Sequence, residues 1–182
     1  MSPLKNMPRL RIALSLAVPL LALGLAACQS DPEELAPQCP LVSVIPYADQ
    51  HVVYNGSGRD LTDLVFRVQI VDVQGKCKGT MGKRTLAAHA QLQMLVTRGP
   101  AASSREVDVL YGVGVVKDGM VLDRRDKTEH VVFPPNADTV RVNADPVDFV
   151  FPTPDGMSGP RYHLYYWLEI SPEEKAANQA QH

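Results

Sequence analysis

Residues 107–122 read VDVLYGVGVVKDGMVL, and this stretch decides the fold class. Apolar residues fill every second position: Val107, Val109, Tyr111, Val113 and Val115. A period of two is typical of a strand that buries one face. Asp118-Gly119 then predicts a tight turn into a second strand at 120–122, because both residue types tolerate positive φ. The stretch therefore predicts an antiparallel hairpin.

The same alternation recurs along the chain. One-sided apolar sets occur at Leu64, Phe66, Val68 and Ile70, at Ala88, Ala90, Leu92, Met94 and Val96, and at Tyr162, Leu164, Tyr166, Leu168 and Ile170. Shorter candidate strands are 131–133, 139–142 and 147–151, and turn residues separate the runs at 55–58, Gly75, Gly79, 99–100, 134–136 and 155–160. Short strands with Gly and Pro between them predict an all-β fold, an immunoglobulin-like or fibronectin-like antiparallel β-sandwich of about seven to nine strands. We expect this domain to span residues 39–170.

The C-terminal segment 171–182 is the one part with a helical pattern. Ser171-Pro172-Glu173-Glu174 fits a capping box with proline at the first helical position. Because few residues follow, we expect a short helix or tail that frays.

The N-terminal sequence predicts an export signal. Lys5, Arg9 and Arg11 precede an apolar run from Ile12 to Ala27, and Leu25-Ala26-Ala27-Cys28 looks like the lipobox of bacterial lipoproteins. This resemblance implies cleavage of residues 1–27, a diacylglycerol on the Cys28 thiol, and a further acyl chain such as palmitate on the new amino terminus. The alternatives are an ordinary secretory signal or an N-terminal membrane helix. Met7 is a second candidate start.

The residues after Cys28 bear on location. They are Gln29 and Ser30 rather than the Asp that retains many Gram-negative lipoproteins in the inner membrane. We therefore expect the periplasmic face of the outer membrane, with the inner membrane as the alternative. Residues 28–38 are polar, acidic and proline-bearing, which predicts a tether with a reach of about 35 Å.

The composition of the expected mature chain argues against nucleic-acid binding. Its 155 residues contain 15 basic and 20 acidic side chains, a formal charge of −5. Nucleic acid rewards a basic face, so we expect no nucleic-acid partner.

Cys39 and Cys77 remain after lipidation of Cys28. In an oxidising compartment such a pair predicts one disulfide, which would stabilise the fold by roughly 4 kcal/mol in the chain-entropy model. Metal ligation or a redox pair are the alternatives, but the sequence has no CxxC or adjacent histidine pattern.

No residue pattern indicates catalysis. The sequence lacks GxSxG and SxxK, and its paired carboxylates at 33–34 and 173–174 fall in the tether and the helix cap. The histidines lack metal-ligand spacing: His51, His89, His130, His163 and His182. We expect no catalytic residue, no metal and no cofactor.

Two surface features are candidate interaction sites. The first is the polar-aromatic face of the last strand, formed by Arg161, His163, Tyr165 and Trp167, since arginine and aromatic side chains are enriched at interfaces. Alternatively these aromatics are core, or lie under the terminal helix. The second is a basic group that could attract phosphorylated lipid head groups or an acidic partner, or be a solvated loop: Lys76, Lys78, Lys83 and Arg84. In a third segment, 58–63, Arg59 is expected to pair with Asp60 or Asp63 or to cap one end of the sandwich.

Several motifs together resemble a family of uncharacterised Gram-negative outer-membrane lipoproteins: the Cys28 lipobox, Cys39-Pro40, GSGRDLTD at 56–63, Cys77, TRGPA at 97–101 and SPEE at 171–174. The resemblance covers the mature chain and implies an envelope location and a single sandwich domain, without an activity. The leading hypothesis is a non-enzymatic interaction module that binds an unidentified envelope protein. The alternatives are a periplasmic binder or carrier of a small ligand or lipid, and an envelope hydrolase.

Overall fold

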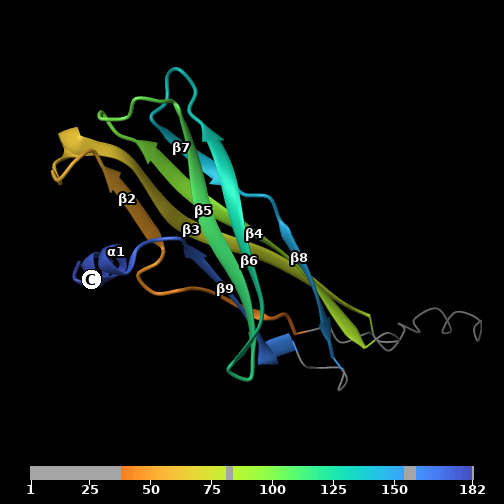
Figure 1. The fold of residues 1–182 in the computed structure, drawn as a ribbon. Helices are drawn as coiled ribbons and strands as arrows, with labels where there is room; N and C mark the ends of the chain where they lie inside the picture. The colour runs from red at the N-terminus through yellow and green to blue at the C-terminus, as the bar shows by residue number, and fades with distance from the viewer. Residues whose placement is uncertain (1–37, 81–83, 154–158, 182) are drawn as a thin grey trace, which may run out of the picture. The chain divides into compact units, whose positions relative to one another are not determined.

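The computed structural model describes residues 38–80, 84–153 and 159–181 (Figure 1). Cys28 and the predicted signal peptide lie outside these ranges. Within them the strands are β1 (Leu41–Val44), β2 (Gln50–Tyr54), β3 (Leu64–Thr80), β4 (Thr85–Arg98), β5 (Glu106–Lys117), β6 (Met120–Val132), β7 (Thr139–Asn143), β8 (Val147–Pro152) and β9 (Tyr162–Leu168). The helical elements are two 3-10 turns, η1 (Leu61–Asp63) and η3 (Gly159–Arg161), and the helix α1 (Pro172–Gln179). The all-β expectation is confirmed, with nine strands in the described part.

The strands form two sheets, and one of them curls like half of a barrel. The four-stranded sheet has the order β1-β9-β5-β6, and the five-stranded sheet has the order β2-β3-β4-β7 with β8 also paired to β4. β7 pairs with residues 93–97 of β4, and β8 pairs with residues 85–90. Every pair is antiparallel except β1–β9, where Leu41 to Val44 run parallel to His163 to Tyr166. The expectation of purely antiparallel pairing was therefore wrong for this edge, because β1 enters the sheet beside the last strand rather than through a hairpin.

The core lies between the sheets and follows the predicted alternation. Residues facing inward from β4 are at most 6% exposed: Leu86, Ala88, Ala90, Leu92, Met94 and Val96. The opposing sheet supplies Val109, Tyr111, Val113 and Val115 from β5, and Tyr162, Leu164, Tyr166 and Leu168 from β9. Burial of these apolar faces is the main force that holds the two sheets together.

Two predicted turns lie inside a strand. Gly75 pairs with Ala90 and Gly79 pairs with Leu86, so β3 continues to Thr80 as half of one long hairpin with β4. The turn prediction at these glycines was wrong because cross-strand pairing outweighs their weak strand propensity. β1 and β2, in contrast, were not predicted at all, since neither has a clear alternation.

β6 extends far beyond the predicted 120–122 and is an edge strand. Three of its charged residues share the face of buried Val131 and are only partly exposed: Asp123, Arg125 and Glu129. The guanidinium of Arg125 lies 4.4 Å from the ring centroid of Phe149 and donates to the Asp148 carbonyl across the gap between the sheets. Inward-pointing charges on an edge strand disfavour pairing with another sheet.

The predicted C-terminal helix forms as α1 and contacts the domain. Ser171 caps it as predicted, because its Oγ accepts from the Glu174 backbone N–H at 3.1 Å. The Glu174 carboxylate then reaches β2, where it accepts from the Val52 backbone N–H at 2.7 Å and lies 2.9 Å from Nδ1 of His51. Asn178 is buried and donates to two backbone carbonyls at the start of β2, those of residues 47 and 50. These contacts satisfy part of the open edge of β2.

Cys39 and Cys77 form the predicted disulfide, with Cα atoms 5.6 Å apart. Cys39 lies just before β1 and Cys77 lies within β3, so the bond joins the two sheets. An oxidised pair is typical of proteins outside the cytosol.

The segment 56–63 is a tight connection. A Cβ at Gly58 would lie 1.9 Å from Oδ2 of Asp63, so a larger residue here would displace the Asp63 carboxylate. The guanidinium of Arg59 lies 5.3 Å from the ring centroid of Tyr54. The expected pairing with Asp60 or Asp63 is absent from the ion pairs of the described residues.

Candidate interaction surface

The predicted polar-aromatic face lies on the outer side of the four-stranded sheet. His163, Tyr165 and Trp167 alternate with the buried residues of β9 and are partly exposed, and Arg161 precedes them in η3. The structure thus places the three β9 residues on one side of the sheet, and Arg161 pairs with Asp118 next to the β5–β6 hairpin. Neither aromatic residue belongs to the buried core.

Trp167 lies against two glycines of the neighbouring strand β5. A Cβ at Gly112 would lie 2.1 Å from Cζ2 of the indole, and one at Gly114 would lie 3.3 Å from Cζ3. Gly112 pairs directly with Trp167 in the β5–β9 register. The two glycines therefore form a flat shelf on which the indole rests, a role that the sequence pattern Gly112-Val113-Gly114 did not indicate.

Polar contacts fix the orientation of the indole. The Nε1–H of Trp167 donates to Oε1 of Glu169 at 2.7 Å, and Arg124 donates to the same oxygen at 2.9 Å. The Arg124 guanidinium also lies 5.1 Å from the indole centroid, within the range of a cation–π contact. Asp126, hydrogen-bonded to Arg124, is the main cause that raises the pKa of the guanidinium. The sequence analysis missed Arg124 and Glu169 because strand register decides their proximity.

The surface beside Trp167 is mixed apolar and polar. Leu110 faces outward from β5 and is 53% exposed, and the hydroxyl of Tyr165 lies 3.1 Å from Nδ1 of His163. Arg161 donates through Nε and Nη2 to both carboxylate oxygens of Asp118, at 3.1 and 2.6 Å. Aromatic and arginine side chains are enriched at protein interfaces.

The basic group has a different structure from the predicted loop. Lys76 and Lys78 are exposed on β3, where they pair with His89 and Ala87 of β4. Arg84 is exposed at the hairpin, and Lys83 lies outside the described residues. No ion pair among the described residues involves Lys76, Lys78 or Arg84.

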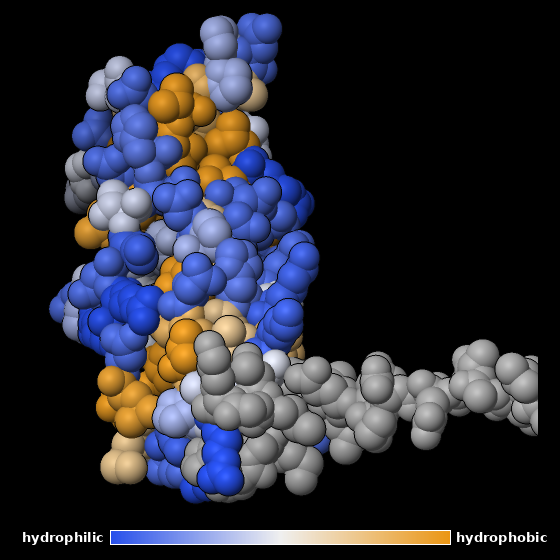
Figure 2. Space-filling view, turned by 90° about the vertical axis from the view of Figure 1, so that its right-hand side faces the viewer, coloured by the Kyte–Doolittle hydropathy of each residue, from blue (hydrophilic) through white to orange (hydrophobic). Residues whose placement is uncertain are grey.

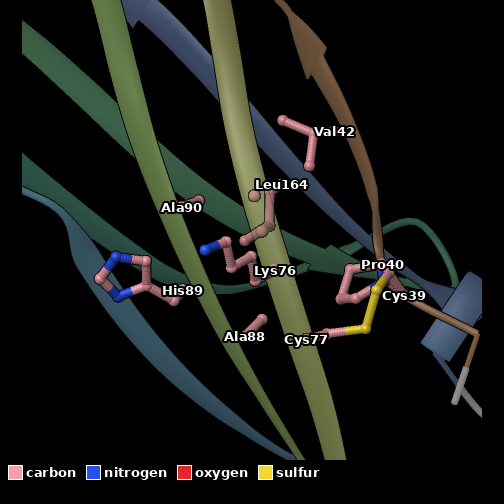
Figure 3. Close-up of a pocket in the computed structure, with 10 residues that line it drawn as sticks. Cys39, Pro40, Val42, Lys76, Cys77, Ala88, His89, Ala90 and Leu164 are labelled. Atoms are coloured by element: carbon pink, nitrogen blue, oxygen red, sulfur yellow. A yellow bond between two sulfur atoms is a disulfide. The ribbon is translucent and has the colours of Figure 1, made fainter. Parts of the chain in front are cut away.

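Three cavities lined by described residues are small. One of about 130 Å³ lies beside the disulfide, with Pro40, Ala88 and Leu164 in its wall (Figure 3). Others of about 140 and 250 Å³ lie near Phe133 and between residues 42–44 and 70–73. Sites for small molecules usually have volumes of about 300–1,000 Å³. These three cavities fall below that range.

Each described histidine has its own polar partner. Nδ1 lies 2.9 Å from Glu174 in His51, 2.8 Å from Asp148 in His89 and 2.7 Å from Asp108 in His130. The hydrogen bond to Asp108 is the main cause that raises the pKa of His130. Among the residues that the structure describes, no group of three or more metal-ligating side chains comes together, and His182 lies outside them.

Two core tyrosines keep their protons at neutral pH. Burial raises the pKa of Tyr111 to about 12, and burial also raises the pKa of Tyr166. The Tyr166 hydroxyl is buried without a hydrogen-bond partner among the described residues. Because an unpartnered buried hydroxyl is costly, this group is a local weak point of the core.

No protein-family model matches the chain, and neither a curated protein nor a solved structure is detectably similar to it. The lipoprotein family resemblance therefore remains a prediction. None of the helices in the described ranges has the length and apolar character that a membrane crossing requires.

Proposed function

We propose that the chain is a membrane-anchored lipoprotein of the bacterial cell envelope whose β-sandwich is a non-enzymatic interaction module. The outer face of the four-stranded sheet is the observation that carries this proposal. It presents Tyr165, Trp167 and Leu110 on a regular strand scaffold, and the shelf of Gly112 holds the indole in one orientation. A surface ordered before binding loses less entropy when a partner docks.

The finer fold description is also a proposal. Two facing sheets with a common core support an immunoglobulin-like or fibronectin-like sandwich. The connectivity is different, because immunoglobulin domains keep their last two strands in one sheet, whereas β8 and β9 lie in different sheets.

The volumes of the three cavities favour the module over a carrier of a small ligand or lipid. Apolar exposure in Figure 2 likewise occurs as separate patches between hydrophilic residues on the face shown. A protein partner can use such a surface without a deep pocket.

We propose that acylated Cys28 anchors the chain on the periplasmic face of the outer membrane. The disulfide supports a location outside the cytosol. Mass spectrometry of the N-terminal peptide tests the anchor directly: acylated Cys28 is the expected result, and an unmodified Cys28 in the membrane fraction would contradict it. Cys28→Ser is the matched variant and is expected to abolish acylation.

Photo-crosslinking in intact cells tests the module. A photoreactive residue replaces Tyr165, and a second chain carries it at Val150, which is 70% exposed on the outer face of the other sheet. One dominant envelope protein crosslinked from position 165 and absent from position 150 is the expected result. The same products from both positions, or none from 165, would contradict the proposal.

Purified partner then allows a measurement of affinity. Tyr165→Ala is expected to weaken binding roughly thirtyfold, the loss typical of an interface hot spot of about 2 kcal/mol. Tyr165 suits this test better than Trp167, because its side-chain hydrogen bond and ring contact are both with His163 of the same strand.

A further inference from the structure

The point where the chain enters the domain and two hairpins lie at the same end of the sandwich. Leu41, two residues after Cys39, pairs with His163 at the start of β9. Tyr162 of β9 pairs with Lys117 at the β5–β6 hairpin. Likewise Thr85 of the β3–β4 hairpin pairs with Pro152 at the end of β8 (Figure 1). We call this region the Cys39 end.

The Cys39 end has an excess of cations. Lys76 and Lys78 flank Cys77, and Arg84 lies at the hairpin, its carbonyl accepting from the Thr153 backbone N–H. These three cations have no ion pair among the described residues. Of the acidic groups nearby, Asp118 is paired with Arg161, and the carboxylate of Asp148 lies 2.8 Å from Nδ1 of His89. Among the described residues, this end therefore carries three cations that no ion pair neutralises, although the chain as a whole is acidic.

The same end exposes apolar side chains. Met120 is 64% exposed and Val121 is 71% exposed at the tip of the β5–β6 hairpin. One row of paired residues runs across four strands from Leu41, which is 51% exposed, through His163 and Val116 to Val121. Apolar residues beside cations suit the boundary between phospholipid head groups and acyl chains.

The position where the chain enters the domain indicates that this surface faces the membrane. The disulfide fixes Cys39 to Cys77, whose neighbours in β3 are Lys76 and Lys78, and a tether from Cys28 reaches at most about 35 Å. An acylated Cys28 would hold these cations near the bilayer at high effective concentration, so weak contacts suffice.

We infer that the Cys39 end is a membrane-facing surface that binds anionic phospholipid, an inference that rests on the proposed anchor. Lys76, Lys78 and Arg84 contact head-group phosphates, and Met120 and Val121 enter the interface. The domain then stands on the membrane with the opposite end, near η1 and α1, directed away from it.

Vesicle flotation tests the inference. The fragment 35–182 is one compact unit that contains the disulfide and the entire core, so it is a valid test protein. At low ionic strength it is expected to float with phosphatidylglycerol vesicles and to remain unbound with phosphatidylcholine vesicles. Lys76→Gln with Lys78→Gln is expected to lower partitioning about 25-fold, since each cation near an anionic surface contributes about fivefold.

The matched control is Lys127→Gln with Lys175→Gln, which removes the same charge from exposed positions on β6 and α1. It is expected to change partitioning less than about fivefold. Equal binding to both vesicle types, or an equal loss in both double variants, would overturn the inference.

A second measurement uses the full lipidated chain in vesicles. In a Trp167→Phe background, brominated phospholipid is expected to quench the tryptophan placed by Met120→Trp. The tryptophan placed by Leu61→Trp, at the far end of β3, is expected to stay bright; the reverse pattern would overturn the orientation. Because the fragment lacks Cys28, its vesicle binding is independent of acylation. A failed anchor and a failed membrane-facing surface are therefore distinguishable.

Discussion

Gly112→Ala tests the indole shelf. The new Cβ would lie 2.1, 2.2 and 2.7 Å from Cζ2, Cε2 and Nε1 of Trp167, well inside contact distance. The indole must therefore lift from β5. In doing so it loses the hydrogen bond to Glu169 and the stacking of Arg124.

The size of the effect follows from these contacts. Overpacking of this kind costs about 1–3 kcal/mol, and the lost hydrogen bond adds about 1 kcal/mol at a partly exposed site. Alanine offsets roughly 0.4–1 kcal/mol by restricting the unfolded chain. We expect the free energy of unfolding to fall by about 2 kcal/mol, which lowers Tm by about 4–8 °C for a domain of this size.

Urea unfolding followed by fluorescence measures both the free energy of unfolding and the environment of the indole. Trp167 is the single tryptophan of the chain, so its emission reports its own environment. Gly75→Ala is the control, because its Cβ would make only an ordinary 3.5 Å contact with the His89 carbonyl. If the Gly112→Ala variant has the same stability and emission as the parent protein, the proposal that the indole needs glycine at position 112 is refuted.

Three further predictions concern the disulfide, the helix and alkaline pH. Replacing Cys39 and Cys77 with serine is expected to lower the free energy of unfolding by up to about 4 kcal/mol, measured in urea, and to make it insensitive to reductant; a variant that still responds to reductant would contradict this. Asn178→Ala removes two hydrogen bonds to backbone carbonyls and is expected to cost about 1–3 kcal/mol and to expose α1 to limited proteolysis, so unchanged cleavage would count against helix docking. Burial raises the pKa of Tyr111 from 10.0 to about 12, so the stability linked to its proton is complete below pH 10 and is lost as pH rises toward 12. Tyr111→Phe is expected to reduce that alkaline loss in unfolding measurements across pH, and an identical pH profile would exclude this cause.

Most of what the sequence predicted about the fold came from the alternation of apolar residues. It identified β4, β5 and β9 and their buried faces, because one-sided burial imposes a period of two on the sequence. It failed for β1, whose pairing partner β9 is more than a hundred residues away and whose own four residues are mostly exposed. It also failed at Gly75 and Gly79, where a local turn signal competes with a long-range ladder.

The candidate face was likewise predictable only in part. Its residues on β9 were predictable, since alternation places 163, 165 and 167 on one side. Their environment was not, because Gly112 and Arg124 reach Trp167 only through the register of three strands. The docking of α1 was also beyond local rules, since the partners of Glu174 lie more than a hundred residues earlier.

The disulfide also determines how the domain carries mechanical load. A pull on the chain ahead of Cys39 passes through the sulfur atoms to Cys77, in the middle of a strand paired with β4 from Phe66 to Thr80. The short strand β1, which has only β9 as its partner, lies outside this force path. With the bond reduced, the same pull would peel β1 from the sheet one residue pair at a time. The oxidised bond thus places tension on the longest hairpin of the fold and shields its most weakly attached strand.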